Sequence, residues 1–217
     1  MLGLPNTTEF NKRIPKQMFY EKMVMTAALK KIFVEQIKTI YWRNKLSVDT
    51  VNLAEGKNVK EIQVFEVKLN TPGLDEVALR QIDKVIPYHL LYLLEYQGKY
   101  QAWICYKENM GSKDSYKVGG YYHTEWMEAS TLPVKLEGLD LDAAYENFVR
   151  QVAGAVLTEG TEKNVDLKDA VERAALREKL QKKITTLENK IRKEKQFNRV
   201  VKMRDELRAL KKELMRL

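Results

Sequence analysis

The sequence predicts an α+β domain, in which helices pack on a mostly antiparallel four-stranded sheet, followed by a C-terminal antiparallel helical hairpin or coiled coil. Two observations lead to this prediction: helical and strand-like apolar patterns alternate along the first 160 residues, and the composition changes abruptly at Gly160. All Trp and Tyr residues precede Gly160, whereas neither Gly nor Pro follows it. Such a shift is typical of a globular domain joined to an extended helical segment.

The first part of the domain is predicted to be helix, strand, helix. Thr26 is a suitable N-cap for a helix that runs to about Asn44, because apolar residues follow it at three- and four-residue spacing. Residues 58–69 alternate as a strand. Thr71-Pro72 is a helix start signal, and Pro87 ends the helix that follows.

The second part is predicted to be three antiparallel strands and a helix. The apolar runs 88–96 and 99–106 are joined by Gln97-Gly98, which indicates a β-hairpin. Residues 116–126 form another strand, whose two adjacent glycines suggest a bulge or a close backbone approach. An amphipathic helix over 141–156 completes the domain.

The C-terminal segment has a mirror-symmetric apolar pattern. Apolar residues recur every three or four positions, lose phase around Phe197, and then resume. The predicted seam consists of Leu180, Ile184, Leu187, Ile191, Met203, Leu207, Leu210 and Leu214. This symmetry favours an antiparallel hairpin, with Asn198 as a possible cap of the returning helix. The alternative is a continuous interrupted helix that dimerises to cover its seam. The predicted organisation is a domain at 1–157, a linker at 158–167 and an arm at 168–217.

The positive charge of the chain belongs to this arm. The chain has 38 Lys+Arg and 30 Asp+Glu, a net charge of +8. Residues 1–160 contain 20 of each sign, so residues 161–217 contain 18 basic and 10 acidic residues, and 18 − 10 = +8. The candidate contacts to nucleic acid or to a partner are Arg192, Lys193, Lys195, Arg199, Lys202 and Arg204. Lysine and arginine can bind a phosphate backbone, but they also form the solvated face of many helices.

Several classes of protein do not fit the composition. A single cysteine, Cys105, rules out a disulfide framework and a cysteine-cluster zinc site. No apolar run approaches 18 residues, and the N-terminus lacks the features of a signal peptide, so we expect a cytoplasmic protein with no membrane partner. No known enzyme motif is present, which favours a protein that is not an enzyme. Cys105, His89 and His123 are interpreted as structural, and no metal site or cofactor is predicted.

Glu66 and Lys68 are the only candidate catalytic residues. They are separated by one residue in a predicted strand, so their side chains lie on one face. Nucleases of the PD-(D/E)xK class use such a pair to hold a divalent metal and to position the attacking water. Those enzymes also need an acidic residue on a preceding strand and consecutive strands before the pair, neither of which the pattern offers. A structural ion pair is the alternative interpretation.

Five ordered segments together resemble a known family. They are Ile14–Lys16, Tyr41–Leu46, Ile62–Lys68, Ile82–His89 and Tyr122–Trp126. They resemble the prokaryotic domain-of-unknown-function family 4391, and the resemblance covers essentially the whole chain. It implies a setting beside helicase, DNA-methyltransferase and restriction-type subunits in defence loci. It implies no catalytic residue.

Three hypotheses follow for function. The first is a non-catalytic accessory subunit of a prokaryotic DNA-processing defence or restriction–modification complex. Its protein partner would be a helicase- or methyltransferase-type subunit, and its basic arm would contact that partner or a DNA or RNA backbone. The second is a metal-dependent nuclease-like protein that uses Glu66 and Lys68. The third is a homodimeric scaffold held together by the C-terminal helices.

Overall fold

The computed structural model describes residues 2–110, 116–158 and 165–217. The chain divides into two compact units, Met1–Gly154 and Ala155–Leu217. The sequence prediction put this boundary at 157/158. Most of the predicted linker, residues 159–164, lies outside the described residues. No described helix combines the length and the apolar character needed to span a membrane.

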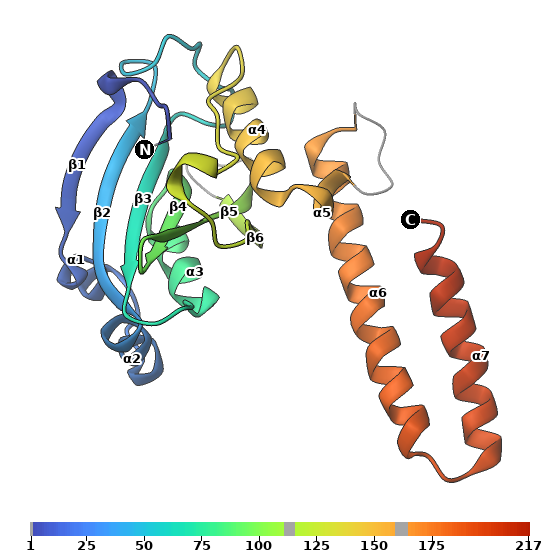
Figure 1. Cartoon of the computed structure of the whole chain (residues 1–217). Coiled ribbons are helices and arrows are strands. Elements are labelled where there is room, and N and C mark those ends of the chain that lie inside the picture. The colour runs from blue at the N-terminus through green and yellow to red at the C-terminus, as the bar shows by residue number, and fades with distance from the viewer. Residues whose placement is uncertain (1, 111–115, 159–164) are drawn as a thin grey trace. The chain divides into compact units, whose positions relative to one another are not determined.

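The first unit is built on one mixed sheet, whose strand order is the same as the order in the chain (Figure 1). The described strands are β1 (Glu9–Ile14), β2 (Ile37–Leu46), β3 (Ile62–Leu69), β4 (His89–Tyr96), β5 (Lys99–Asn109) and β6 (Tyr116–His123). Neighbouring strands are antiparallel except for β3 and β4, which are parallel. The α+β class is therefore confirmed, but the expected four-stranded, mostly antiparallel sheet is wrong in part: six strands are described, and the sheet is mixed.

The parallel pair follows from the helix between its two strands. A parallel pair needs a crossover connection, and α3 (Glu76–Val85) provides it. This helix begins later than the Thr71-Pro72 signal predicts, because the Asp75 carboxylate caps it by accepting a hydrogen bond from the Val77 amide at 2.9 Å. The helix ends just before Pro87, as expected.

The predicted helix from Thr26 to Asn44 is correct only in its first half. α2 (Ala27–Glu35) has Thr26 as its N-cap, as predicted, and the Thr26 hydroxyl accepts a hydrogen bond from the Leu29 amide at 3.2 Å. The chain then becomes β2, where β-branched and aromatic residues over 37–42 favour a strand. The apolar spacing over residues 26–44 is compatible with one long helix and also with a helix followed by a strand. Periodicity alone therefore predicts the wrong secondary structure for the second half.

A lysine ammonium binds carbonyl groups at the C-terminal end of α2. Lys16, in α1 (Lys16–Lys22), donates from Nζ to the Phe33 carbonyl at 2.7 Å and also to the Ile37 carbonyl. Helix C-termini leave carbonyl groups unsatisfied, and a nearby cation satisfies them. Burial lowers the pKa of Lys16, with a smaller effect from Arg13. This contact links α1 to the end of α2 and to the start of β2.

Helices cover both faces of the sheet. α1, α2 and α3 pack on one face, and Phe33, Phe65 and Tyr92 are fully buried in the resulting core. α4 (Leu141–Ala153) packs on the opposite face. The Tyr145 ring of α4 lies 4.3 Å from the ring of His89, which alternates with the core residue Leu90 along β4. Short 3-10 helices lie at Asn6–Thr8 and Ala129–Thr131.

The start of α4 is fixed by two aspartates. Asp140 caps the helix by accepting a hydrogen bond from the Ala143 amide at 2.8 Å. The Asp142 carboxylate accepts hydrogen bonds from the backbone amides of residues 57, 58 and 59 at 2.7–3.2 Å. A Cβ atom on Gly56 would lie 2.4 Å from Asp142 Oδ1, so a side chain at residue 56 would collide with this contact. The loop before β3 is therefore anchored to α4.

The second unit contains α5 (Ala155–Thr158), α6 (Leu167–Lys193) and α7 (Phe197–Leu214). α6 and α7 pack against each other as the hairpin alternative requires (Figure 1). The predicted cap Asn198 is wrong, because α7 starts earlier and Gln196 occupies the N-cap position. The turn forms without Gly or Pro because Glu194 Oε1 accepts hydrogen bonds from the amides of Lys195 and Gln196, each at 2.9 Å.

Candidate functional sites

Glu66 lies between two cations. Its side chain is fully buried, with Arg43 Nε 2.8 Å from Oε2 and Lys68 Nζ 3.7 Å from Oε1. Arg43 comes from β2, the strand beside β3. The hydrogen bond to Glu66 is the main cause of the raised pKa of Arg43, so the guanidinium stays charged. The predicted pair is brought together, but with a third charged residue that the sequence analysis did not identify.

Arg43 occupies the region where a nuclease would need an acid. Two strands precede β3, so the sequence-based objection that consecutive strands are missing is wrong. The chemical objection remains, because the β2 residues next to Glu66 are Tyr41, directly opposite in the register, and Arg43. Within the described residues, no group of three His, Cys, Asp or Glu side chains could hold a metal ion. The observed contacts are those of a partly buried ion pair.

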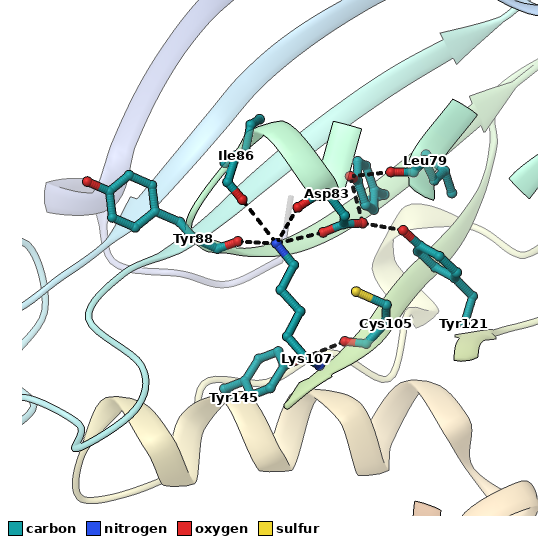
Figure 2. Close-up of polar contacts among 9 residues, drawn as sticks. Leu79, Asp83, Ile86, Tyr88, Cys105, Lys107, Tyr121 and Tyr145 are labelled. Carbon is teal, nitrogen blue, oxygen red and sulfur yellow. Dashed lines mark hydrogen bonds and ion pairs between the residues drawn. The ribbon is translucent and has the colours of Figure 1, made fainter. Parts of the chain in front are cut away.

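A second buried charge pair joins α3 to β5 (Figure 2). Lys107 Nζ lies 3.0 Å from Asp83 Oδ1, and both side chains are almost completely inaccessible to solvent. The same ammonium donates to the carbonyl oxygens of Asp83, Ile86 and Tyr88, at 3.2, 3.2 and 2.5 Å. Lys107 thus neutralises a buried carboxylate and also binds the carbonyls at the end of α3.

Tyrosine hydroxyls complete this network. Tyr92 donates to Asp83 Oδ2 at 3.0 Å, and Tyr121 donates to the same oxygen. On the other side of β5, the Tyr145 hydroxyl donates to the Cys105 carbonyl at 2.5 Å and accepts from the Lys107 amide at 2.9 Å. Burial is the main cause of the raised pKa values of Tyr92, Tyr121 and Tyr145.

The histidines and the cysteine have structural positions. Burial raises the pKa of the Cys105 thiol well above its usual value, so this thiol stays protonated. Burial, with a smaller contribution from Lys107, lowers the pKa of His89 to about 3. His123 stacks on Trp103 with ring centroids 4.5 Å apart, on the face opposite to His89. The structure does not bring the two imidazoles together.

The predicted seam of the arm is mostly buried on α6 and partly exposed on α7. Leu180, Ile184 and Leu187 of α6 are 3%, 6% and 8% exposed. No residue of α7 is buried. The remaining seam residues, Ile191, Met203, Leu207, Leu210 and Leu214, are all partly exposed. The six predicted basic contact residues are exposed, and Arg199 lies 3.8 Å from Glu194.

A groove of about 590 Å³ runs between α6 and α7. Leu187 and Leu210 are part of its lining. Four lysines of α6 also line it: Lys179, Lys182, Lys183 and Lys190. Two carboxylates, Glu178 and Glu206, are present as well, and Glu178 pairs with Lys182 at 2.5 Å. Sequence reasoning located the basic cluster at the hairpin tip and missed this second basic surface, although the lysine spacing along α6 signals it.

Comparisons with known proteins identify the family. Residues 2–214 match the family described as domain of unknown function DUF4391. The chain belongs to this family. The sequence resemblance is therefore confirmed. No curated protein matches, and no solved structure matches.

In this DUF4391 chain, the three charged features have different exposures. The Asp83–Lys107 pair is enclosed in the core, and Glu66 is buried but reached by two half-exposed cations. The lysines of the α6–α7 groove are exposed, and they adjoin partly covered apolar side chains. Of the three, the groove is the one that a macromolecule can reach directly.

Proposed function

We propose that the protein is a non-catalytic accessory subunit whose α6–α7 groove binds an acidic amphipathic helix of a partner protein. The observation that carries this proposal is the absence of any buried residue in α7. An amphipathic helix normally hides its apolar face against a neighbour. In this hairpin α6 alone covers the seam of α7, and a third helix would complete the packing.

The chemistry of the groove supports a helical protein as the occupant. Leu187 and Leu210 provide apolar contact, and four lysines against two glutamates favour a negatively charged ligand. A phosphate backbone would satisfy the lysines but leave the apolar lining uncovered. An amphipathic helix with acidic flanks satisfies both.

The cellular setting in this proposal comes from the family resemblance. We propose that the partner is a helicase- or methyltransferase-type subunit of a prokaryotic DNA-processing defence or restriction–modification complex. The separation of charge supports such a division of roles, since residues 1–160 are neutral and residues 161–217 carry the +8. The first unit would then hold the subunit in its complex, and the arm would bind the partner helix.

The test is site-specific photo-crosslinking in the native host. A photo-reactive amino acid replaces Thr186, which lines the groove, and a control chain carries it at Lys30, an exposed residue of α2. We expect position 186, but not position 30, to crosslink to an acidic amphipathic helix of another protein. The charge reversal Lys179→Glu with Lys183→Glu should reduce this product at least tenfold. A product with nucleic acid, or with a second copy of the same chain, would refute the proposal.

The nuclease alternative draws support from one observation, the presence of two strands before β3. Its test is cleavage of DNA or RNA in Mg²⁺ or Mn²⁺. Activity that disappears in both Glu66→Ala and Lys68→Ala would establish it and would overturn the non-catalytic assignment. Because Arg43 holds Glu66 in an ion pair, we expect no metal-dependent cleavage.

The homodimer alternative uses the same partly exposed seam on α7. It predicts a mass of about twice 25.4 kDa in light scattering, and a shift to the monomer mass in Leu210→Lys. A monomer at all concentrations would exclude it.

A further inference from the structure

The first unit contains a cavity that none of the functions above uses. It has a volume of about 480 Å³. Its lining comes from β1, α1, β2, β3 and the connection between α3 and β4. It lies on the sheet face covered by α1 and α3, because Phe65 and Phe19 of its lining belong to that core. β1 is an edge strand, so the cavity adjoins an open edge of the sheet. We call it the β1–α1 cavity.

Aromatic rings form much of its lining. Phe10 and Trp42 lie with ring centroids 4.2 Å apart and planes inclined by 41°, and Phe65 lies 6.2 Å from Trp42. The indole nitrogen of Trp42 donates to the Asn44 carbonyl at 2.9 Å, which fixes the orientation of the ring. Tyr88 and Met18, also in the lining, are 37% and 48% exposed. These side chains provide a partly exposed apolar surface for a flat ligand, in which the orientation of the Trp42 ring is fixed.

The charged residues in the lining of the cavity are all positive. Lys12, Arg13 and Lys22 belong to the lining, and no Asp or Glu does. All three are exposed, and none forms an ion pair with a carboxylate in the described part of the chain. Lys12 Nζ lies 4.4 Å above the ring of Phe10. Three unpaired cations beside an aromatic surface favour a ligand that joins a flat ring to an anion.

A buried amide adds a polar group. Gln63 is 4% exposed and belongs to the lining. Its amide nitrogen donates to Glu61 Oε1 at 2.5 Å, whereas its carbonyl oxygen accepts no hydrogen bond from the described residues. This oxygen is not one of the described buried side-chain atoms that lack a hydrogen-bond partner. It can therefore accept a hydrogen bond from water or from an N–H group of a ligand.

The strand at the edge of the cavity is distorted. The β1–β2 register shifts between Glu9 and Lys12, and Asn11 has φ of +48°. A bulge of this kind changes the direction of side chains and interrupts the ladder, and positive φ at a residue other than glycine costs energy. The distortion falls between Phe10 and Lys12, which both line the cavity.

We propose that the β1–α1 cavity binds a base of a single-stranded nucleic acid, with the neighbouring phosphates on Lys12, Arg13 and Lys22. Aromatic stacking together with a positively charged track is how proteins bind single strands without reading a duplex. An exocyclic or ring N–H of the base would donate to the Gln63 carbonyl. Bases in a duplex are paired and stacked inside, so a duplex cannot fill the cavity. This site is independent of the α6–α7 groove.

The test uses the full-length chain and a fluorescein-labelled single-stranded DNA of mixed sequence, followed by anisotropy over a range of salt concentrations. Phe10→Ala should weaken binding about 5- to 150-fold, the range expected for one stacked base. Lys12→Ala with Arg13→Ala should weaken binding and reduce the salt slope by about 1.4, at ~0.7 per phosphate contact on a single strand. The matched control is Lys30→Ala with Lys57→Ala, which removes two exposed charges of the same unit outside the cavity. It should bind within about twofold of wild type.

Competition and folding controls complete the experiment. Unlabelled single strand should displace the probe, whereas a duplex of the same sequence should do so at least tenfold less well. Because Lys12 and Arg13 are exposed, we expect their replacement to leave the fold intact. If Phe10→Ala unfolds the protein, the Lys12/Arg13 variant therefore provides the test. The proposal is overturned if wild type does not bind at 50 mM salt, if the Lys12/Arg13 variant equals its control, or if the duplex or a fatty acid competes as well as the single strand.

Discussion

Lys107 shows what a single charged side chain contributes inside this core. Its ammonium lies against Asp83 and against three carbonyls at the end of α3, so one residue neutralises a carboxylate and satisfies a helix terminus. Lys16 binds the carbonyls at the end of α2 in the same way. In both places a lysine from a neighbouring element fixes the point at which a helix gives way to the next strand.

Removing this ammonium should be costly. Lys107→Met leaves Asp83 buried without its cation, and we expect a loss of about 3–5 kcal/mol in the free energy of unfolding. The measurement is urea denaturation followed by tryptophan fluorescence. Lys117→Met is the matched control, because that lysine is 68% exposed and 3.7 Å from Glu108, and its loss should cost less than about 1 kcal/mol. Similar losses in the two variants would contradict the role of Lys107.

His89 should make the stability depend on pH. Its folded-state pKa is lowered to about 3, while an unfolded histidine has a pKa near 6.5, so between these values the unfolded chain binds a proton that the folded chain does not. The contribution of His89 to the free energy of unfolding is therefore fully present above about pH 6.5 and decreases as the pH falls towards 3. The advantage of wild type over His89→Gln in the free energy of unfolding should shrink by about 1.4 kcal/mol per pH unit between pH 6 and 4.

Urea titrations at several pH values measure this difference. His123→Gln removes the other imidazole from an exposed position and serves as the control. A constant gap between wild type and His89→Gln would show that His89 is protonated in the folded chain.

Only some of the roles and contacts of single residues could be predicted from the sequence. It assigned Cys105 and His89 to structural roles, and both are buried. The position of Arg43 beside Glu66 is not predictable in this way, because it depends on the β2–β3 register and the sequence pattern places β2 in a helix. The burial of Asp83 and Lys107 is indicated by the sequence, because each is a charged residue at a buried position of an otherwise apolar pattern.

At the scale of elements, local turn chemistry was the more reliable guide. The Gln97-Gly98 dipeptide correctly indicated the β4–β5 hairpin, and both residues have positive φ, +50° and +81°. The helical period over 26–44 was misleading, because buried residues at 29, 33, 37 and 40 suit a helix followed by a strand equally well. β1 was missed because only six residues form it, with few apolar positions.

The turn of this hairpin can be improved. Asn tolerates positive φ better than Gln, so Gln97→Asn should raise the free energy of unfolding by about 0.5–1 kcal/mol. Gln97→Val should lower it by about 1–2 kcal/mol, because a β-branched residue resists this conformation. Thermal and urea denaturation measure both changes. Equal stability of the two variants would mean that the turn conformation in solution differs from the one described.

For the whole molecule, the chain divides into two compact units at 154/155, and its composition changes at Gly160. Trp42, Trp103 and Trp126 all lie in the first unit, so tryptophan fluorescence reports on that unit alone. Far-UV circular dichroism reports strongly on the second, because α6 and α7 contain 27 and 18 residues. The composition and the apolar spacing predict a C-terminal helical segment, whereas the exposure of α7 depends on how the two helices pack.

The two units should unfold separately. The second unit has few buried residues and none on α7, so urea should melt its helices at a lower concentration than it unfolds the sheet. We expect the transition seen by circular dichroism at 222 nm to begin before the transition seen by tryptophan fluorescence. A single transition that coincides for both probes would show that the chain unfolds as one cooperative unit.

The strand order of the sheet also bears on how the chain is made. Because β1 to β6 lie in chain order, each new strand pairs with the strand synthesised just before it. The longest connection between partners is the stretch from β1 to β2, followed by the α3 crossover between β3 and β4. Pairings between segments that are close in sequence form quickly, since little loop entropy is lost. A nascent chain leaving the ribosome can therefore extend the sheet one strand at a time, and the helical arm, which follows the last strand in the chain, emerges after it.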